Sequence, residues 1–522
     1  MTLPSSILKL SQILMEIGAR PIVVGGYVRD HFLDHESKDI DIEVYGISSL
    51  DVLKSSLETF APVHEVGKNF GVLKIRLDEN DLDISLPRTE IKTAKGHKGF
   101  HVQTNGYLDF NTASKRRDFT MNAIGYDIKT DFFIDPHGGK EDIKAGIIRH
   151  VDDDSFIEDP LRVLRAVQFA ARFNFKLHAN TLKLCQIMIK DDMLSELPKE
   201  RIFEEYKKLL LKAPRPSVGF ELLDKMNALF PELKALQGVV QDETKHPEGD
   251  VWTHTMMSLD AMAELKTGSK KKDMILMLAS LCHDLGKASS TKIIDNKVSA
   301  EEHNNFLEPT ISLLERLTDQ KSLVDAIVPL VQEHSVPSRL YKQNAQDSEI
   351  RRLSTRVNIE DLVTLARADN FGRTTQEAIN KEYPAGEWLL KKAKELNILN
   401  KGPEQILQGR HLIASGLKAG KTFKDILHQA YEAQLEVHGG YGQFDAELAD
   451  GLRLNVGVRY EDAKQLVVPI LLQGGTALPA TGLNNDYWLP AGTLTWNFAE
   501  DMQLRFAASK TIARPQFREL AP

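Results

Sequence analysis

The sequence predicts a multidomain protein with an α/β head, a long all-α region and a short β-rich C-terminal segment. Three observations support this prediction. Short β-branched runs alternate with helical patterns up to about residue 150. Apolar residues then recur with helical period from about residue 151 to 438. Beyond residue 438 the apolar residues alternate with a period of two, which is typical of strands.

The composition is that of a soluble globular protein. The chain has 522 residues, of which 42% are hydrophobic and 27% charged. Residues 1–438 contain no apolar run long enough for a membrane-spanning helix, and the N-terminus lacks the features of a signal peptide. We therefore expect no membrane partner for residues 1–438. Two cysteines, Cys185 and Cys282, cannot form a disulfide framework, so we expect a reducing cytoplasmic location. The net charge of −8 argues against bulk nucleic-acid binding, but it allows a local basic surface.

The first part of the predicted head is an amphipathic helix followed by strands near 21–24, 39–44, 71–77 and 82–86. The first strand delivers Gly25 and Gly26 to a helix that begins near Tyr27. Unpaired N–H groups and the helix dipole favour anions there, and glycine lets a phosphate approach the backbone closely. Taken alone, the glycine pair is equally explained by a tight turn.

A pair of carboxylates follows on the second strand. Asp39 and Asp41 are two residues apart, so both point to the same face of the sheet. Carboxylates this close repel each other unless cations lie between them, and oxygen ligands suit Mg²⁺. Two Mg²⁺ ions could activate a 3′-hydroxyl and stabilise a pyrophosphate leaving group. Asp83 is the first candidate for a third carboxylate and Asp81 the second; a solvated strand edge is the alternative for the pair alone.

Five ordered motifs identify a family. The chain resembles the bacterial class II tRNA nucleotidyltransferases and poly(A) polymerases in GGYVRD, DIDIE, RRDFTMNAI (116–124), DPHGGKEDI (135–143) and EDPLRVLRAVQFAARF (158–173). The resemblance implies that Asp39 and Asp41 carry two Mg²⁺ ions. It also implies that nucleotides are bound by Gly25, Gly26, Arg29, Arg116, Arg117, Asp118, Asn122, Asp159, Arg162 and Arg165. Residues 85–100 resemble the flexible loop of that family.

Asp159 and Arg162 correspond to the nucleotide-selecting motif of the family. If this segment is helical, the two side chains lie on one face. A carboxylate accepts from an exocyclic amino group and a guanidinium donates to ring acceptors, and cytosine and adenine both offer that combination. An intrahelical salt bridge is the alternative explanation for the pair.

A second set of residues suggests a metal site in the helical region. His254, His283, Asp284 and Asp369 occur in consecutive helical, mostly apolar segments and form a plausible ligand set for a divalent metal of unknown identity. The order resembles the HD phosphohydrolase superfamily, which implies hydrolysis of phosphoesters such as 2′,3′-cyclic phosphates. His303 and His334 fall where further ligands or phosphate contacts are expected, and Lys287 could meet a substrate phosphate. Each histidine alone could equally be a buried core residue.

The last segment has a different character. In residues 439–522 apolar side chains alternate, as at Leu494, Trp496 and Phe498, around a turn-rich spacer. This segment resembles a fragment of an outer-membrane TonB-dependent receptor. We therefore predict that the chain is chimeric; a divergent β-rich extension is the alternative.

The predicted organisation has five parts. They are a nucleotidyltransferase head (1–150), a helical neck and body (151–235), an HD domain (236–375), a C-terminal helical tail (376–438) and the β segment (439–522). The predicted function is addition of CCA to tRNA 3′ ends from CTP and ATP, with binding of the tRNA acceptor arm and a second phosphohydrolase activity. The alternatives are a poly(A) polymerase and an HD phosphohydrolase whose head only binds RNA.

Overall fold

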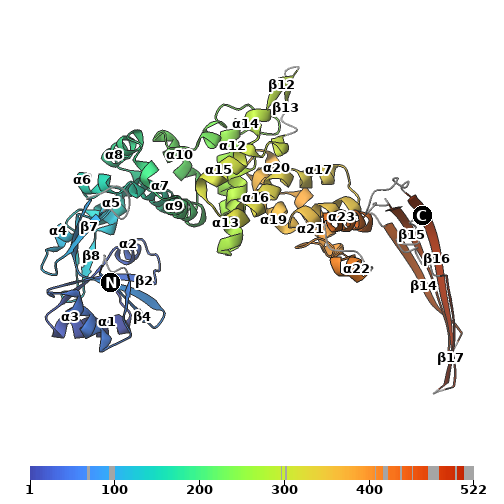
Figure 1. Ribbon diagram of the computed structural model, residues 1–522, viewed down its shortest axis with the longest axis horizontal. Helices are drawn as coiled ribbons and strands as arrows, with labels where there is room; N and C mark the ends of the chain where they lie inside the picture. Colours follow the sequence, from blue (N-terminus) through green and yellow to red (C-terminus); the bar gives the residue numbers. More distant parts are fainter. Residues whose placement is uncertain are drawn as a thin grey trace. The chain divides into compact units, whose positions relative to one another are not determined.

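The computed structural model divides the chain into two compact units. It describes residues 1–66, 71–92, 100–294, 297–299, 303–405, 407–414, 421–435, 438–449, 451–467, 481–499 and 502–510. The first unit comprises residues 1–335 and 364–383, and the second comprises residues 336–363 and 384–522. Figure 1 labels the elements in chain order.

The head is built on a seven-stranded sheet with the order β3-β4-β5-β2-β1-β8-β9. Its strands are β1 (Arg20–Val24), β2 (Asp39–Tyr45), β3 (His64–Val66), β4 (Val72–Leu77), β5 (Asn80–Ser85), β8 (Gly125–Asp127) and β9 (Phe132–Ile134). β2 and β5 run parallel, and the other pairs are antiparallel. Ile40, Ile42 and Val44 alternate along β2 and are buried, so one face of this strand packs into the core.

Short helices and a hairpin complete the head. They are α1 (Ser5–Glu16), α2 (Gly26–Phe32), α3 (Leu50–Glu58), β6 (Arg88–Lys92), β7 (Phe100–Thr104), α4 (Phe110–Ser114), η1 (Thr120–Asn122) and α5 (Gly139–Ala145). The predicted amphipathic helix is α1, which buries Ile7, Leu10 and Leu14. All four predicted strands are found, with ends shifted by at most two residues. The β6–β7 hairpin, β8 and β9 were not predicted, and residues 93–99 of the expected flexible loop lie outside the described residues.

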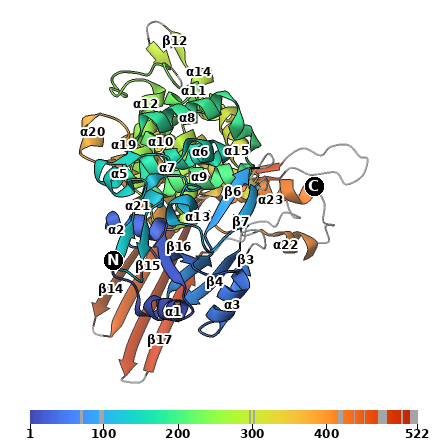
Figure 2. The same cartoon turned by 90° about the vertical axis from the view of Figure 1, so that its left-hand side faces the viewer.

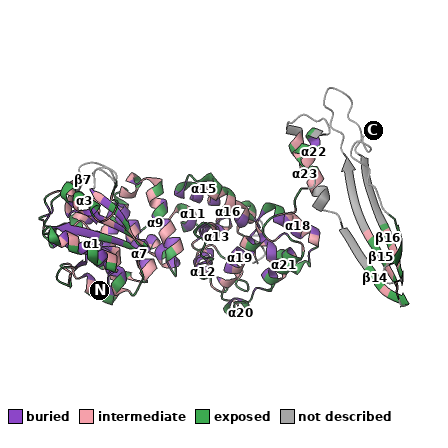
Figure 3. Ribbon diagram, turned by 90° about the horizontal axis from the view of Figure 1, so that it is seen from below, coloured by how far each residue is buried: buried purple, intermediate pink, exposed green. Residues whose placement is uncertain are grey.

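The rest of the first unit is mainly helical. Its elements are β10 (Ile147–Ile148), α6 (Asp153–Glu158), α7 (Leu161–Phe173), β11 (Lys176–Leu177), α8 (Ala179–Lys190), η2 (Met193–Glu196), α9 (Lys199–Lys212), α10 (Ser217–Lys225), α11 (Pro231–Lys234), α12 (Val251–Glu264), α13 (Lys270–Cys282), α14 (Lys287–Ser290), β12 (Lys292–Ile294), β13 (Lys297–Ser299), η3 (His303–Asn305), α15 (Glu308–Leu317), α16 (Lys321–Glu333), α20 (Gln376–Ile379) and the part of α19 (Ile359–Phe371) from residue 364 onward. The last two turns of α13 are buried on every side, as expected for a helix at the centre of a bundle (Figure 3).

The second unit combines helices with a separate sheet. Its elements are α17 (Val336–Lys342), α18 (Asp347–Arg356), α21 (Pro384–Glu395), α22 (Gly409–Ala414), α23 (Lys421–Leu435), β14 (His438–Ala449), β15 (Leu452–Val467), β16 (Thr481–Ala499) and β17 (Met502–Ser509). The four strands pair in chain order and antiparallel, and they lie side by side in Figure 2. Trp488, Trp496 and Phe506 are exposed on this sheet. The β-rich C-terminal segment that the sequence predicts is confirmed by these four strands.

No helix in the described part of the chain has both the length and the apolar character needed to cross a membrane.

Candidate active sites

The candidate carboxylate residues of the head lie on β2 and β5, which pair in parallel. The parallel register places Asp83 beside Asp41 and Asp81 beside Asp39. The Asp83 carboxylate is 2.9 Å from Lys74 Nζ, whereas Asp81 is 3.8 Å from the exposed Arg76. Because of this register, Asp83, the first candidate from sequence, is a nearer neighbour of Asp41 than Asp81 is.

Asp41 occupies an electrostatically unfavourable position for a carboxylate. Desolvation raises its pKa, the positive charge of Arg117 opposes this, and the charges of Asp83, Glu43 and Asp39 raise it further. The net effect is a pKa above the ordinary value for aspartate. A divalent cation beside these oxygens would relieve the repulsion, so the donor set fits the predicted metal.

Gly25 brings the backbone against this carboxylate. Its φ of +73° is a conformation that residues with a side chain rarely adopt. A Cβ atom at this position would lie 2.9 Å from Asp41 Oδ2 and 3.3 Å from Arg117 Nη1. The turn between β1 and α2 therefore leaves no room for a side chain beside Asp41, as expected of a backbone that phosphate approaches closely.

Replacing Gly25 by Ala is expected to reduce nucleotide transfer by at least about tenfold, because the new Cβ displaces Asp41 or Arg117 and each tenfold corresponds to about 1.4 kcal/mol. Gly18→Ala is the matched control, since Gly18 also has a positive φ, of +84°, but has open space around its Cβ position. Both variants should lose a similar amount of stability, on the order of 1–3 kcal/mol from backbone strain. Equal transfer rates in the two variants would contradict the assignment; the measurement is CTP incorporation into tRNA.

Glu43 is a functional candidate that sequence reasoning missed. Its side chain is 2% exposed, and Oε1 accepts hydrogen bonds from Arg116 Nη2 at 2.6 Å and Arg117 Nη2 at 2.7 Å. Tyr45 Oη donates to the other oxygen at 2.8 Å. Although burial alone would raise it, Arg117 and Arg116 hold the pKa of Glu43 below its ordinary value. Glu43 thus anchors both arginines behind the carboxylates; the alternation Asp-x-Asp-x-Glu was the available signal.

Four of the predicted nucleotide-binding residues form one buried network. Arg29 Nη1 donates to Asn122 Oδ1 at 2.8 Å, and Asn122 Nδ2 donates to Asp118 Oδ1 at 2.9 Å. Arg165 Nε donates to Asp118 Oδ2 at 2.7 Å. Burial would raise the pKa of Asp118, but Arg165 and Asn122 hold it at about 2. The structure therefore brings these residues together as a connection from α2 to α7.

Asp159 and Arg162 do not share one helix face, contrary to the helical prediction. Asp159 is extended, with φ −116° and ψ 100°, between α6 and α7. The physical reason is Pro160, since a residue before proline is disfavoured in the helical conformation. Arg162 Nη1 donates to Ser155 O at 2.8 Å, and its Nη2 donates to Arg116 O at 2.5 Å.

Asp159 lies instead near a residue of α9. Its Oδ2 is 3.6 Å from Arg201 Nη2, and its Oδ1 accepts from Leu161 N at 3.2 Å. The intrahelical salt bridge that the sequence left open is not formed between these two described residues. Arg201 was not predicted.

The predicted ligands of the helical region also come together. His254 lies on α12, His283 and Asp284 follow α13, and Asp369 lies on α19. His254 Nε2 is 3.0 Å from Asp369 Oδ1 and 3.3 Å from His283 Nε2. His283 Nε2 is 3.3 Å from Asp284 Oδ2.

His303 and His334 form a second group on the other side of Asp284. His303 Nε2 is 3.4 Å from Asp284 Oδ1 and 3.4 Å from His334 Nε2. Asp284 thus turns one oxygen to each group, and the ligand atoms within a group all lie within 4.8 Å of one another. We refer to His254, His283 and Asp284 with His303, His334 and Asp369 as the HD cluster.

The tautomers of the HD cluster suit metal binding. His283 Nδ1 donates to Ser280 O at 2.7 Å, and His334 Nδ1 donates to Val331 O at 2.6 Å. Since a carbonyl only accepts, the Nδ1 atoms carry the protons and the Nε2 lone pairs face the centre. Burial and then His283 lower the pKa of His334 to about 3, which keeps it neutral. Both oxygens of Asp284 are buried, Oδ2 beside Lys287 and His283 and Oδ1 beside His303, so the donor set fits a divalent cation.

Two cations border the HD cluster. Lys287 Nζ lies 2.7 Å from Asp284 Oδ2 and donates to Gln241 Oε1 at 2.9 Å. Arg373, which was not predicted, donates to Asp369 Oδ1 at 2.9 Å. Lys287 is therefore held by an ion pair with Asp284 and a hydrogen bond to Gln241.

Comparisons with known proteins agree with these two sites. Residues 22–149 match the poly A polymerase head domain, and residues 174–237 match the probable RNA and SrmB-binding site of polymerase A. Residues 251–374 match the HD domain. Residues 415–522 match the TonB dependent receptor-like beta-barrel, which confirms the resemblance of the last segment. Fold and sites thus define a nucleotidyltransferase with an appended HD domain.

The family follows from curated relatives. The multifunctional CCA protein of Pasteurella multocida is 33% identical over 380 residues, covering 70% of this chain and 87% of that protein. The one from Nitrosococcus oceani is 31% identical, and the match covers 97% of that protein but only 79% of this chain. This chain belongs to the family of multifunctional CCA proteins.

Solved structures show the same fold. A CCA-adding enzyme in apo form II has a TM-score of 0.55 at 21% identity, and the match covers 83% of this chain and 92% of that one. The Thermotoga maritima CCA-adding enzyme complexed with tRNA has a TM-score of 0.51 at 20% identity, with the same coverage.

Proposed function

We propose that this protein adds CCA to the 3′ end of tRNA, using CTP and ATP, by nucleotidyl transfer that requires two Mg²⁺ ions. The observations that carry the proposal are the strand register, which pairs Asp41 with Asp83, and the close approach of the Gly25 backbone to Asp41. Relatives named multifunctional CCA proteins support the substrate. Structures of CCA-adding enzymes with ATP and CTP support the nucleotides.

Each head residue then has a role. Asp39 and Asp41, with Asp83, would hold the Mg²⁺ ions, which polarise the attacking 3′-hydroxyl and stabilise the leaving pyrophosphate. The backbone at Gly25 and Gly26 receives the triphosphate. Arg116 and Arg117, fixed by Glu43, supply positive charge on the same side as Asp41.

Selection of the base is assigned to Asp159 and Arg162. Carboxylate and guanidinium together match the donor and acceptor edges of cytosine and adenine. Arg162 is held by hydrogen bonds to two backbone carbonyls, whereas Asp159 lies beside Arg201. The carboxylate and the guanidinium are therefore positioned by different parts of the protein.

The remaining domains are assigned as the sequence predicts. The head (1–150) is followed by the neck and body (151–235), which bind the tRNA acceptor arm through phosphates and shape. The HD domain (236–375) hydrolyses phosphoesters such as 2′,3′-cyclic phosphates with a divalent metal held by the HD cluster. The helical tail (376–438) precedes a foreign β segment (439–522), and the enzyme acts in the cytoplasm.

The proposal is tested with purified protein, tRNA that lacks CCA, and single nucleotides. CTP alone should add two residues, and ATP should add one residue only after CTP. Long ATP-only tails on any RNA would instead establish the poly(A) polymerase. Incorporation of CTP only, or of ATP only, when both nucleotides are supplied would reduce the assignment to a partial reaction.

The alternative from another class is an HD phosphohydrolase whose head only binds RNA. The complete carboxylate group on β2 and β5 argues against it, because RNA binding alone gives no reason to hold like charges together.

A further inference from the structure

A closed loop brings one more carboxylate to the HD cluster. The loop spans residues 239–250, between α11 and α12. Val251 N donates to Val239 O at 3.0 Å and Gly238 N donates to Asp250 Oδ2 at 2.7 Å, which closes the two ends. Gln241 Nε2 donates across the loop to Gly249 O at 3.3 Å. The same loop supplies the Gln241 oxygen that holds Lys287.

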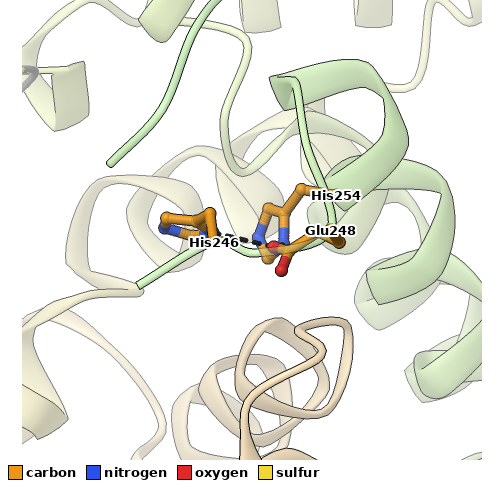
Figure 4. A group of neighbouring side chains, drawn as sticks. All are labelled: His246, Glu248 and His254. Carbon is orange, nitrogen blue, oxygen red and sulfur yellow. Dashed lines mark hydrogen bonds and ion pairs between the residues drawn. The ribbon is translucent and has the colours of Figure 1, made fainter. Parts of the chain in front are cut away.

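Glu248 of this loop lies against His254, as Figure 4 shows. Its side chain is 1% exposed, and Oε1 accepts from His254 Nδ1 at 2.8 Å. The same oxygen accepts from His246 Nδ1 at 2.9 Å. The other oxygen accepts from Thr374 N at 3.2 Å. Neither Glu248 nor His246 was singled out by the sequence.

We propose that Glu248 is a positioning residue for the HD metal site. By accepting from Nδ1, Glu248 fixes the proton of His254 on that nitrogen and leaves the Nε2 lone pair facing His283 and Asp369. A carboxylate behind a ligating imidazole also makes the imidazole a stronger ligand. This inference rests on the proposed metal in the HD domain and adds a residue that contacts no metal itself.

The other interpretation of these residues is a separate metal group made of His246, Glu248 and His254, whose ligand atoms lie close together. The distances argue against it. Ligands placed tetrahedrally at about 2.1 Å from one ion lie about 3.4 Å apart. The contacts of 2.8 and 2.9 Å to Glu248 Oε1 are instead ordinary hydrogen bonds.

Glu248 also supports the far side of the site. Thr374 follows Arg373, whose guanidinium holds Asp369 Oδ1 at 2.9 Å. The hydrogen bond from Thr374 N therefore ties the loop to the end of the segment that carries Asp369. One carboxylate thus contacts both α12, which carries His254, and the segment that follows α19, the helix that carries Asp369.

The test is a Co²⁺ titration of the full-length chain, in which binding is measured by calorimetry and by the visible absorption of bound Co²⁺. The parent carries Asp39→Ala and Asp41→Ala, which silence the metal site of the head. Glu248→Gln in this parent should bind Co²⁺ about 10- to 100-fold more weakly and with an altered visible spectrum, since loss of such a partner typically has this effect. Glu232→Gln is the matched control, because Glu232 accepts from Ser312 and Arg316 and, within the described residues, hydrogen-bonds to no histidine.

The outcomes separate the inference from the function on which it rests. Co²⁺ binding by Glu248→Gln within threefold of the parent, with an unchanged spectrum, would overturn the role of Glu248. A parent that binds Co²⁺ no better than its His283→Ala variant would overturn the HD metal site and the inference with it. Thermal unfolding of the metal-free variants verifies folding. If Glu248→Gln does not fold, Glu248→Asp decides: affinity and spectrum between parent and His283→Ala support the inference, and unchanged values overturn it.

Discussion

Asp41→Asn is expected to lower CTP incorporation into tRNA by at least about 1,000-fold, which corresponds to roughly 4 kcal/mol of transition-state stabilisation. The amide keeps the shape of the side chain but removes the negative charge on which metal binding between β2 and β5 depends. The hydrolysis of 2′,3′-cyclic phosphates should be unchanged. Primer extension with labelled CTP and a phosphodiesterase assay on the same preparation measure both activities.

The control for this prediction is Asp81→Asn, on the same strand pair but beside Asp39 rather than Asp41. It should retain nucleotide transfer within a few-fold of the wild-type rate.

The stability of Asp41→Asn gives a second readout. Because the pKa of Asp41 is raised in the folded state, its ionisation destabilises the metal-free fold as the pH rises above the ordinary pKa of aspartate. Metal-free Asp41→Asn should therefore unfold at or above the wild-type temperature at pH 7; a large decrease would mean misfolding rather than lost chemistry.

Asp284→Asn is expected to abolish phosphoester hydrolysis, again by about 1,000-fold or more, while CCA addition continues. Asp284 offers an oxygen to both histidine groups, whereas the amide of asparagine has only one oxygen and no charge. Although burial alone would raise it, Lys287 and His283 hold the pKa of Asp284 well below its ordinary value. The carboxylate is therefore ionised throughout the working pH range. Release of phosphate from 2′-nucleotides is the measurement.

Asp273→Asn is the control for Asp284→Asn. Asp273 is a buried carboxylate at the other end of α13, where it accepts from Thr267 and Gly268. Its replacement should cost stability without selective loss of hydrolysis. If Asp284→Asn retained hydrolysis while folded, the HD cluster would not be the hydrolytic site.

Features set by local spacing could be predicted from the sequence. The fold class is confirmed, because strand and helix periods are read over a few residues. Asp39 and Asp41 share a face for the same reason. The order of His254, His283 and Asp284 predicted their meeting once a helical bundle was assumed. Their chemical roles stay predictions.

Features that depend on distant contacts could not be predicted. Glu43 and its two arginines are more than seventy positions apart in the chain, and Glu248 meets Thr374 across 126 positions. The alternation Asp-x-Asp-x-Glu places Glu43 on the same strand face as Asp39 and Asp41 but does not reveal its two arginine partners, and nothing in the local pattern distinguishes Glu248 from a solvated glutamate. The extended conformation of Asp159, in contrast, could have been predicted, because a residue before proline is disfavoured in a helix.

The shared position of Asp284 has a consequence for how the HD cluster fills. The two oxygens of Asp284 belong to one rigid, delocalised carboxylate. A cation bound at one histidine group would therefore change how strongly, and in which direction, the other oxygen of Asp284 can bind a cation at the second group. If each group held a cation, the two affinities would be thermodynamically linked, and the coupling would act equally in both directions. Titration curves should deviate from those of independent sites, and a variant at His334 should change what is measured at His254.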